Sequence, residues 1–459
     1  MTPPGRARPE AQLVPAVLAE ALSGLNGAPH WYVALSGGVD STVLLHLLRQ
    51  WRDTHPGTPP LTAIHINHGL QHNADAWQRH CEALCKKMHI PLLCRRVEVR
   101  VGNRGLEAAA RDARYRVFER ELGAGEVLLL GHHNDDQVET FFLRLLRGAG
   151  VRGLAAMPAR RPLGQGLLAR PLLAFGRAQI EAYAAGHGLE WVEDPSNRDQ
   201  SLDRNFLRAE VLPLIASRWP GFRRTVSRTS AHMAGSAALI DALLPAPETV
   251  RSVIGDPGIP LAALADRSAE EAALMLRNWL QAAGLHPPGS GPLGEFLRQL
   301  REAGARTRPR LQCSAYTLQR YRDGVYLLPA AAAPPEGSLT LAPGECLDIP
   351  GVGRVALEPA RAGGLLLGAG EKPELAWRGG GERCRLRGRE GSRSLKKLLQ
   401  ERGVPPWWRA RVPLLCLGDE LLAVGALGVC HCSRWRASPG GEGPLWELRW
   451  EPDIDPACD

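Results

Sequence analysis

The sequence predicts an α/β protein in three parts. A parallel-sheet nucleotide-binding domain (1–215) precedes a helical middle domain (216–333) and a small mixed α/β domain (340–459). This prediction rests on strand-like and helix-like segments that alternate between residues 31 and 215, and on changes of composition at the two boundaries. The 459 residues, 44% of them hydrophobic, also exceed one typical domain of about 150 residues.

The first part alternates between short apolar runs and segments with apolar residues three and four positions apart. The runs predict strands at 31–35, 61–66, 92–99 and 126–130, and the helical patterns predict helices at 42–51, 75–88 and 106–122. Strands that alternate with helices form right-handed βαβ units in a parallel sheet. Ligands bind such sheets at the carboxyl ends of the strands.

The middle part contains Ala- and Leu-rich stretches without a chemical motif. These stretches predict helices at 230–244, 268–283 and 294–303. A Pro- and Ala-rich segment from Pro329 to Pro335 predicts a linker. Short strands and Gly-rich turns then predict the mixed third domain.

Charge and cysteine content exclude several classes of protein. The net charge of +8 favours an anionic partner, although the excess of Arg over Lys is as easily explained by genomic base composition. No apolar run approaches the ~20 residues of a membrane span, and the first ten residues contain no signal core. The ten cysteines are scattered without a zinc pattern, which is typical of a reducing cytosol. We therefore expect a cytoplasmic protein with ordinary thiols and no membrane association.

A loop after the first predicted strand has the character of a phosphate-binding site. Gly37 and Gly38 can adopt positive φ and let backbone N–H groups surround an anion, while Ser36 and Ser41 add hydroxyl donors. Asp40 would repel phosphate unless a cation intervenes, so we interpret it as a Mg²⁺ ligand. The predicted nucleotide-binding residues are Ser36, Gly37, Gly38, Val39, Asp40 and Ser41. The loop lacks the Lys of a Walker motif, which favours pyrophosphate release over γ-phosphoryl transfer. The alternative is an ordinary strand-to-helix turn with good capping residues.

A second polar cluster follows the predicted strand at 126–130. Asp136 and Glu139 lie about 60° apart on the following helix, to one side of its apolar stripe. Acidic residues at a helix start often only match the helix dipole. Here His132, His133 and Asp135 gather with them at the carboxyl end of a central strand, which favours a ligand site over capping, and no distant ligand group supports zinc.

The loop Ser36-Gly-Gly-Val-Asp-Ser41 is the signature of the PP-loop, or N-type, ATP pyrophosphatase group. Within it the chain resembles the tRNA(Ile)-lysidine synthase family. The further segments that carry the resemblance are His65–Leu70, Asn73–Trp77, Leu106–Tyr115, Leu130–Thr140, Arg147–Gly150, Glu193–Asn197, Arg204-Asn205, Gly391–Leu399 and Val404–Arg409. The matches cover most of 31–215 and 378–430, while the middle helices match in position and character only.

The resemblance implies an ATP-dependent ligase that modifies tRNA(Ile) with a CAU anticodon. In that family ATP adenylates O2 of the wobble cytidine, and the ε-amine of free L-lysine then displaces AMP at C2, which gives lysidine and changes codon specificity from AUG to AUA. Chemistry of this kind requires a cation at the phosphates and carboxylates for the incoming ammonium.

The resemblance also assigns roles to single residues. Asp40 would hold Mg²⁺, and Arg111 would stabilise phosphate or AMP. Asp136 and Glu139 would bind the lysine ammonium and help to take its proton, with His132 beside them, and Arg204 would contact the lysine carboxylate or the nucleotide. Arg114 lies one helical turn from Arg111, and Arg208 one turn from Arg204, so either member of each pair fits these roles.

Basic residues concentrate in the third domain. Between Arg378 and Arg411 there are 11 basic and 3 acidic residues. Alternate arginines on a strand with neighbouring tryptophans suit phosphate contact and base stacking. The predicted tRNA-binding residues are Arg383, Arg385, Arg387, Arg389, Arg393, Lys396, Lys397, Trp407, Trp408 and Arg409. A solvated basic face is the alternative, and a second basic cluster lies at 298–322.

Two other functions compete with the ligase. A PP-loop tRNA thiolase needs cysteines near the site, but Cys81, Cys85 and Cys94 form no CxxC pair. A non-catalytic RNA-binding protein would not need an intact loop together with Asp136 and Glu139. The sequence leaves the oligomeric state open, with a homodimer among the options.

Overall fold

The structure is a computed structural model that describes residues 13–69, 73–99, 106–244, 247–304, 307–330, 335–368, 370–387, 391–438 and 443–454. Its contacts divide the chain into two compact units, Met1–Ala242 and Leu243–Asp459. Among the described residues, no helix has both the length and the apolar character to cross a bilayer.

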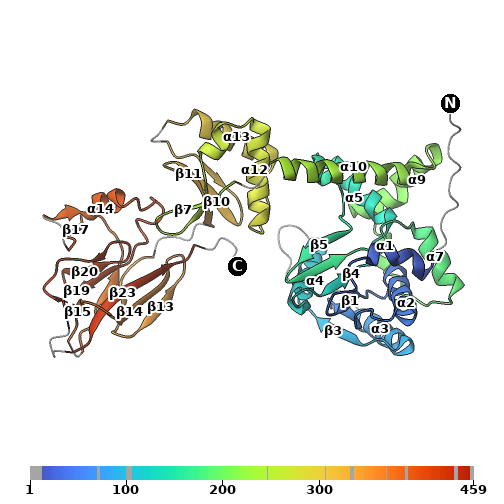
Figure 1. Cartoon of the computed structure of the whole chain (residues 1–459), viewed down its shortest axis with the longest axis horizontal. Helices are drawn as coiled ribbons and strands as arrows, with labels where there is room; N and C mark the ends of the chain where they lie inside the picture. The colour runs from blue at the N-terminus through green and yellow to red at the C-terminus, as the bar shows by residue number, and fades with distance from the viewer. Residues whose placement is uncertain are drawn as a thin grey trace. The chain divides into compact units, whose positions relative to one another are not determined.

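Unit 1 is built on a six-stranded sheet with the order β3-β2-β1-β4-β6-β5 (Figure 1). The strands are β1 (Trp31–Ala34), β2 (Leu61–Asn67), β3 (Leu92–Arg96), β4 (Val127–Leu129), β5 (Arg160–Leu163) and β6 (Gly166–Ala169). All neighbouring pairs are parallel except β5 and β6. The predicted parallel sheet and its four predicted strands are confirmed.

The longer helices of unit 1 connect the strands or follow the sheet. They are α2 (Val39–Thr54), α3 (Ala74–Met88), α4 (Leu106–Glu121), α5 (Asn134–Leu146), α7 (Arg177–Gly186) and α10 (Phe222–Leu243), with the short helices α1 (Ala19–Leu22), α6 (Val151–Leu154), α8 (Asp203–Phe206) and α9 (Leu212–Arg218). A π-helical turn, Leu207–Val211, joins α8 to α9. The helices predicted at 42–51, 75–88 and 106–122 are confirmed as α2, α3 and α4.

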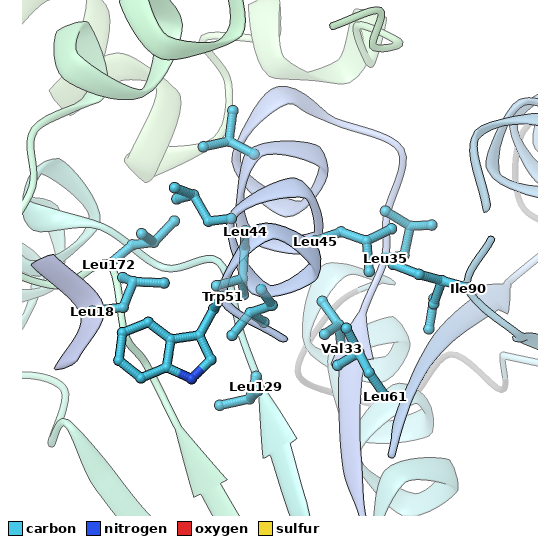
Figure 2. Packing of buried hydrophobic residues seen from close by; sticks show 14 of the residues in the cluster. Leu18, Val33, Leu35, Leu44, Leu45, Trp51, Leu61, Ile90, Leu129 and Leu172 are labelled. Atoms are coloured by element: carbon cyan, nitrogen blue, oxygen red, sulfur yellow. The ribbon is translucent and has the colours of Figure 1, made fainter. Parts of the chain in front are cut away.

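Both faces of the sheet are buried, because successive side chains of a strand point to opposite faces. Trp31 and Val33 of β1 belong to one core together with residues of α2, α3 and α7. Tyr32 and Ala34 pack against the second core, which contains Phe118 of α4. Figure 2 shows Val33, Leu61 and Leu129 of the central strands beside Leu44, Leu45 and Trp51 of α2. This packing fixes the carboxyl ends of β1 and β4 next to each other.

Unit 2 contains an antiparallel sheet that the sequence analysis did not predict. Its order is β7-β8-β11-β10-β9, formed by β7 (Val250–Arg251), β8 (Pro257–Pro260), β9 (Arg310–Gln312), β10 (Tyr316–Tyr321) and β11 (Gly324–Pro329). Helices α11 (Ala262–Ala265), α12 (Ala269–Ala282) and α13 (Ser290–Glu302) share a hydrophobic core with this sheet. The helices predicted at 268–283 and 294–303 are confirmed as α12 and α13. The middle region is therefore mixed rather than purely helical.

The remainder of unit 2 is built on two five-stranded sheets with a shared core. Their orders are β12-β16-β19-β20-β21 and β13-β14-β23-β15-β22. The strands are β12 (Leu339–Thr340), β13 (Cys346–Ile349), β14 (Gly353–Pro359), β15 (Gly364–Leu366), β16 (Glu374–Ala376), β19 (Leu414–Leu417), β20 (Glu420–Val424), β21 (Gly428–Val429), β22 (Trp435–Arg436) and β23 (Leu445–Pro452). The pair β17 (Arg383–Cys384) and β18 (Arg393–Ser394) precedes helix α14 (Leu395–Glu401).

The contacts differ from the predicted boundary at 215/216. Helix α10, predicted from residue 230 in the middle domain, begins at Phe222 and packs on unit 1. Phe222 shares a core with Val138 of α5, and the Ser230 hydroxyl donates to the Ala155 carbonyl at 2.8 Å. The later segments form one unit, in which Trp408 donates to Asp256. The division into three domains stays a prediction.

Candidate active site

The loop between β1 and α2 is ordered by its own hydroxyl groups. The Ser41 hydroxyl accepts the Ser36 backbone N–H at 3.2 Å, lies 3.1 Å from the Ser36 hydroxyl and donates to the Gly38 carbonyl at 3.0 Å. Gly37 has φ +88°, and a Cβ there would lie 3.0 Å from Cγ2 of Val192. Gly38 instead has φ −74° and caps α2, so the expected positive φ is confirmed for Gly37 and wrong for Gly38. The Val39 side chain is buried, which leaves only its backbone to face a ligand.

A close approach of backbones brings the second predicted segment to the loop. Gly131 follows β4, and a Cβ at this position would lie 2.9 Å from the carbonyl oxygen of Asp40. Real Cβ atoms do not approach backbone this closely, so only Gly fits here. The residues that begin α5 therefore meet the start of α2.

Asp40 and Asp136 lie on either side of a buried histidine. His133 is 2% exposed, and its Nε2 lies 3.5 Å from Oδ1 of Asp40 and 3.5 Å from Oδ2 of Asp136. Asp136 also accepts the backbone N–H of His133 at 3.0 Å. The structure thus brings together two carboxylates that the sequence placed almost one hundred residues apart.

The two carboxylates have opposite pKa shifts. Burial raises the pKa of Asp40 above its ordinary value, and the neighbouring His133 and Arg177 offset only part of this effect. Burial also acts to raise the pKa of Asp136, but His133, His132 and the His133 backbone N–H outweigh it and hold that pKa below its ordinary value. Asp136 is therefore ionised at neutral pH, as a group that binds an ammonium must be.

Glu139 contacts both Arg204 and Arg208, the two arginines that the sequence left as alternatives for one role. Its carboxylate is 1% exposed; Nε of Arg208 donates to Oε1 at 2.6 Å, and Nε of Arg204 lies 3.1 Å from Oε2. Arg208 lies on the π-helical turn, and Arg204 lies on α8 just before it. The structure therefore places Arg204 and Arg208 on one carboxylate and does not choose between them.

His132 is held by an arginine that the sequence analysis missed. Nε of Arg170 donates to Nδ1 of His132 at 3.2 Å, and the buried Arg170 also donates to the Pro158 carbonyl. Burial lowers the pKa of His132 to about 3, with Arg170 and Arg111 adding to the effect against Asp136. His132 is therefore neutral, and because Nδ1 accepts, its proton resides on Nε2. Arg170 directly precedes Pro171, and its spacing contains no signal that would have predicted this role.

Arg111 is exposed on α4 and lies over Tyr115. Its NH2 group is 3.5 Å from the Tyr115 hydroxyl, and its guanidinium carbon lies 5.0 Å from the ring centre. Burial acts to raise the pKa of Tyr115, but the positive charges of Arg111, Arg170 and Arg161 lower it overall. Arg111 also contributes to the shift of His132, so it belongs to the same electrostatic environment. The positive charge of Arg114 instead acts on His68.

Two further arginines, Arg223 and Arg177, contact Asp135 at the edge of the site. The Asp135 carboxylate accepts Nε of Arg223 from α10 at 2.5 Å and the backbone N–H of Arg177 at 2.8 Å. The side chain of Arg177 reaches Asp40, with NH1 at 3.0 Å from Oδ2 and 3.3 Å from Oδ1. The two Asp135 contacts join residues 88 and 42 positions apart, and the Asp40 contact joins residues 137 positions apart, so spacing along the chain could not predict them.

The donor set suits a magnesium–nucleotide complex. Asp40 supplies carboxylate oxygens of the kind that Mg²⁺ prefers, and a cation that also binds phosphate oxygens needs few protein ligands. The buried Thr42 hydroxyl, which follows the loop, has no hydrogen-bond partner in the structure. Among the described residues, no three His, Cys, Asp or Glu side chains are arranged to hold a metal ion by themselves.

The predicted tRNA-binding arginines alternate as expected. Arg383, Arg385 and Arg387 are exposed, while Cys384 and Leu386 between them are buried. Lys396 and Lys397 are exposed on α14, Arg393 pairs with Glu401 at 3.0 Å, and the guanidinium of Arg387 lies over Trp435. Arg389 lies outside the described residues.

The expectation for Trp408 is wrong. This side chain is 1% exposed, and its Nε1 donates to Oδ1 of Asp256 at 2.7 Å, so it belongs to the core and presents no face to a base. Trp407 is half-buried against Tyr321, with its Nε1 3.3 Å from Oδ2 of Asp256. Nε of Arg409 donates to the Val404 carbonyl. The sequence does not distinguish a pair of tryptophans that stacks on RNA from a pair that belongs to a hydrophobic core.

The second basic cluster is largely engaged in internal contacts. Arg298 pairs with Glu295 and Glu302, Arg320 donates to the Ala303 carbonyl, and Arg322 donates to the Gln400 carbonyl. One of these partners, Glu295, lies just before the cluster in the sequence.

Comparisons with known proteins agree with this geometry. Residues 12–215 match the family described as the PP-loop domain, which defines the class of nucleotide-binding protein. Residues 259–326 match the TilS substrate binding domain, and residues 374–450 match the TilS substrate C-terminal domain.

Full-length relatives define the particular family. The chain is 43% identical to the tRNA(Ile)-lysidine synthase of Pseudomonas aeruginosa, over 95% of this chain and 96% of that protein. It is also 43% identical to the tRNA(Ile)-lysidine synthase of Alkalilimnicola ehrlichii, over 94% and 97% of the two chains. The chain belongs to the tRNA(Ile)-lysidine synthase family.

Proposed function

We propose that this protein ligates free L-lysine to C2 of the wobble cytidine of CAU-anticodon tRNA(Ile), and that ATP is converted to AMP and pyrophosphate. The observation that carries the proposal is the meeting of Asp40 and Asp136 at His133, at the carboxyl ends of adjacent parallel strands in a chain of this family. This is where open α/β sheets bind their ligands.

In the first step cytidine O2 attacks the α-phosphorus of ATP, and pyrophosphate leaves. The loop Ser36–Ser41 offers N–H and hydroxyl donors to the leaving group, and the start of α2 points at the same place. A bound Mg²⁺ would neutralise phosphate charge, and Asp40 would hold it. Arg111 provides positive charge for the phosphate or AMP.

In the second step the lysine ε-amine attacks C2, and AMP leaves with the former O2. We assign the ammonium to Asp136, which is ionised and hydrogen-bonded in place, and Glu139 completes the acidic environment from its position between Arg204 and Arg208. One of these arginines contacts the lysine carboxylate or the nucleotide. The neutral His132 offers its Nε2–H as a donor beside them.

The deciding experiment measures incorporation of radiolabelled lysine into CAU-anticodon tRNA in the presence of ATP. We expect label in this tRNA and none when uridine replaces the wobble cytidine. An Asp136→Asn variant, which keeps the volume of the side chain and removes its charge, should lose incorporation while its thermal midpoint stays near that of the wild type. No label with wild-type protein would refute the ligase function.

The thiolase alternative finds no support in the cysteines beside the site. Cys81 and Cys85 are buried, and burial raises the pKa of each thiol to about 12. A thiol of this kind is not a nucleophile at neutral pH. A non-catalytic RNA-binding protein would bind tRNA without incorporating lysine, so the same assay distinguishes it.

We propose further that Arg383, Arg385, Arg387, Lys396 and Lys397 contact tRNA phosphates, and that the protein acts in the cytoplasm, where its tRNA substrate resides. A homodimer stays a prediction, which sedimentation of the free protein tests. The three-domain division, with residues 1–215 catalytic and the later parts binding tRNA, is part of this proposal.

A further inference from the structure

Arg177 lies against both oxygens of the Asp40 carboxylate. A single nitrogen, NH1, lies 3.0 Å from one carboxylate oxygen and 3.3 Å from the other. A divalent cation held by Asp40 would need one or both of these oxygens as ligands. The guanidinium would therefore compete with the cation for the carboxylate.

Arg177 is anchored independently of Asp40. Its backbone N–H donates to Oδ2 of Asp135 at 2.8 Å, and its Nε donates to Oε1 of Glu181 at 2.7 Å. It is also the first residue of α7, a ten-residue helix whose start carries partial positive charge. Loss of the Asp40 contact would therefore leave the guanidinium close to the site.

The surrounding charges explain why such a contact is needed. Asp40 is only partly buried, with 28% of its side chain exposed, and lies near a second carboxylate, Asp136. His133 lies beside Asp40, 3.5 Å from Oδ1. Arg177 thus adds a guanidinium charge directly against the Asp40 carboxylate.

We propose that Arg177 holds the Asp40 carboxylate as a substitute cation in the nucleotide-free enzyme, that an entering divalent cation displaces it, and that the displaced guanidinium then binds the pyrophosphate group of ATP. The inference rests on the proposed function in that it takes ATP as the substrate. It assigns a substrate-binding role to a residue outside the loop Ser36–Ser41.

The first test titrates Mn²⁺ into nucleotide-free protein and follows the free ion by electron paramagnetic resonance. Arg177→Met should bind Mn²⁺ about fivefold more tightly than the wild type, because the competing cation is gone. The matched control is Arg223→Met, which removes the same charge from neighbouring Asp135 without touching Asp40. Unchanged affinity in Arg177→Met, or an equal gain in both variants, would overturn the displacement.

The second test measures binding of inorganic pyrophosphate in the presence of Mg²⁺ by calorimetry. Arg177→Met should weaken binding by about tenfold, and Arg177→Lys, which retains a positive charge, should recover part of it. Equal pyrophosphate affinity in wild type and Arg177→Met would overturn the second role. If Arg177→Met does not fold, Arg177→Lys serves in both titrations, with an Mn²⁺ affinity between those expected for the wild type and Arg177→Met.

Both tests are separate from lysine incorporation. If the wild type incorporates no lysine but Mn²⁺ binds more tightly to Arg177→Met, the role of Arg177 stands and the proposed ligase function fails. If the wild type incorporates lysine but wild type and Arg177→Met bind Mn²⁺ equally, the ligase function stands and the proposed role of Arg177 fails.

Discussion

At the scale of single residues, the chemistry depends on how burial acts on charge. Asp40 and His132 both lie in surroundings that disfavour their charged forms, but Asp40 has cationic neighbours to stabilise it, whereas His132 faces Arg170 and remains neutral. Burial therefore raises the pKa of Asp40, at the start of α2, and lowers the pKa of His132, which follows β4. The residue type alone does not reveal how strongly neighbouring charges oppose each shift.

Replacement of Asp40 by Ala should abolish pyrophosphate release. The loop would keep its backbone donors but lose the carboxylate that holds the cation, and we expect a rate loss of at least about 100-fold. A coupled pyrophosphate assay with tRNA and ATP measures this. Asp40→Asn, which retains the shape of the side chain, is the control and should be equally impaired; normal turnover in either variant would refute the Mg²⁺ assignment.

The lowered pKa of His46 leads to a prediction of how the stability of unit 1 depends on pH. Burial lowers its pKa from 6.5 to about 4, so between these values the unfolded chain binds more protons than the folded protein. Stability should therefore fall as pH decreases from 6.5 towards 4. Because solvent screens this half-buried side chain in part, His46 should contribute about 2 kcal/mol of this loss. Denaturation at several pH values measures the slope, which should be smaller in His46→Gln. An unchanged slope in this variant would contradict the low pKa.

At the scale of elements, the π-helical turn Leu207–Val211 places two guanidinium groups on one buried carboxylate. Such turns occur frequently at functional sites, because the extra residue changes where side chains point. Here Arg208 on the turn donates to both oxygens of Glu139, and Nε of Arg204 before it lies 3.1 Å from Oε2. The local sequence, an ordinary amphipathic helix, contains no signal of the turn.

Removal of both arginines should destabilise the protein more than the sum of the single changes. Arg204→Met or Arg208→Met leaves Glu139 with one partner, whereas the double variant leaves a carboxylate of 1% exposure unpaired. We expect a loss of about 3 kcal/mol in the double variant and about 1 kcal/mol in each single variant. Urea denaturation of the four proteins completes the cycle; additive losses would show that the arginines do not share Glu139.

The basic segment around β17 makes a prediction about tRNA binding. Arg385→Ala with Arg387→Ala should weaken binding and reduce the dependence of log affinity on log salt by about one unit for each lost phosphate contact. Filter binding at several salt concentrations measures both quantities. Arg298→Ala is the matched control, because Arg298 is already paired with two glutamates and should leave the salt dependence unchanged.

At the scale of the whole molecule, one buried carboxylate joins segments of unit 2 that lie far apart in the sequence. Asp256 is fully buried and accepts hydrogen bonds from the indoles of Trp407 and Trp408, which come from the far end of the unit in sequence. The Ser252 hydroxyl also donates to this carboxylate. Loss of the acceptor would leave the two indole N–H groups without this partner.

Replacement of Asp256 by Ala should therefore lower the stability of unit 2 by about 2 to 3 kcal/mol. Asp256→Asn retains one carbonyl acceptor and should cost less. Thermal unfolding followed by tryptophan fluorescence measures the difference. Equal stability of the Ala variant and the wild type would contradict the role of this carboxylate.

The sequence predicted those features that depend on local pattern. The strands of the parallel sheet, the helices α2 to α4 and the turn from β1 into α2 each have a signature within about fifteen residues. The sheet of the middle region was not predicted, because its strands are short, such as Gly324–Pro329. The Ala- and Leu-rich helical pattern of the same region dominated the prediction. The roles of Arg170 and Arg177 were not predicted, because their partners His132 and Asp40 lie far away in the sequence.

Position 131 shows that a residue can be indispensable to a reaction without an atom to perform it. The missing side chain of Gly131 is what allows the segment after β4 to approach the first turn of α2. A mutational screen scored by loss of turnover would rank this glycine beside Asp40 and Asp136. Activity would be lost there because an added methyl group pushes the Asp40 backbone away, and not because a reacting group is missing. A second substitution that adds a charged group would therefore not restore activity.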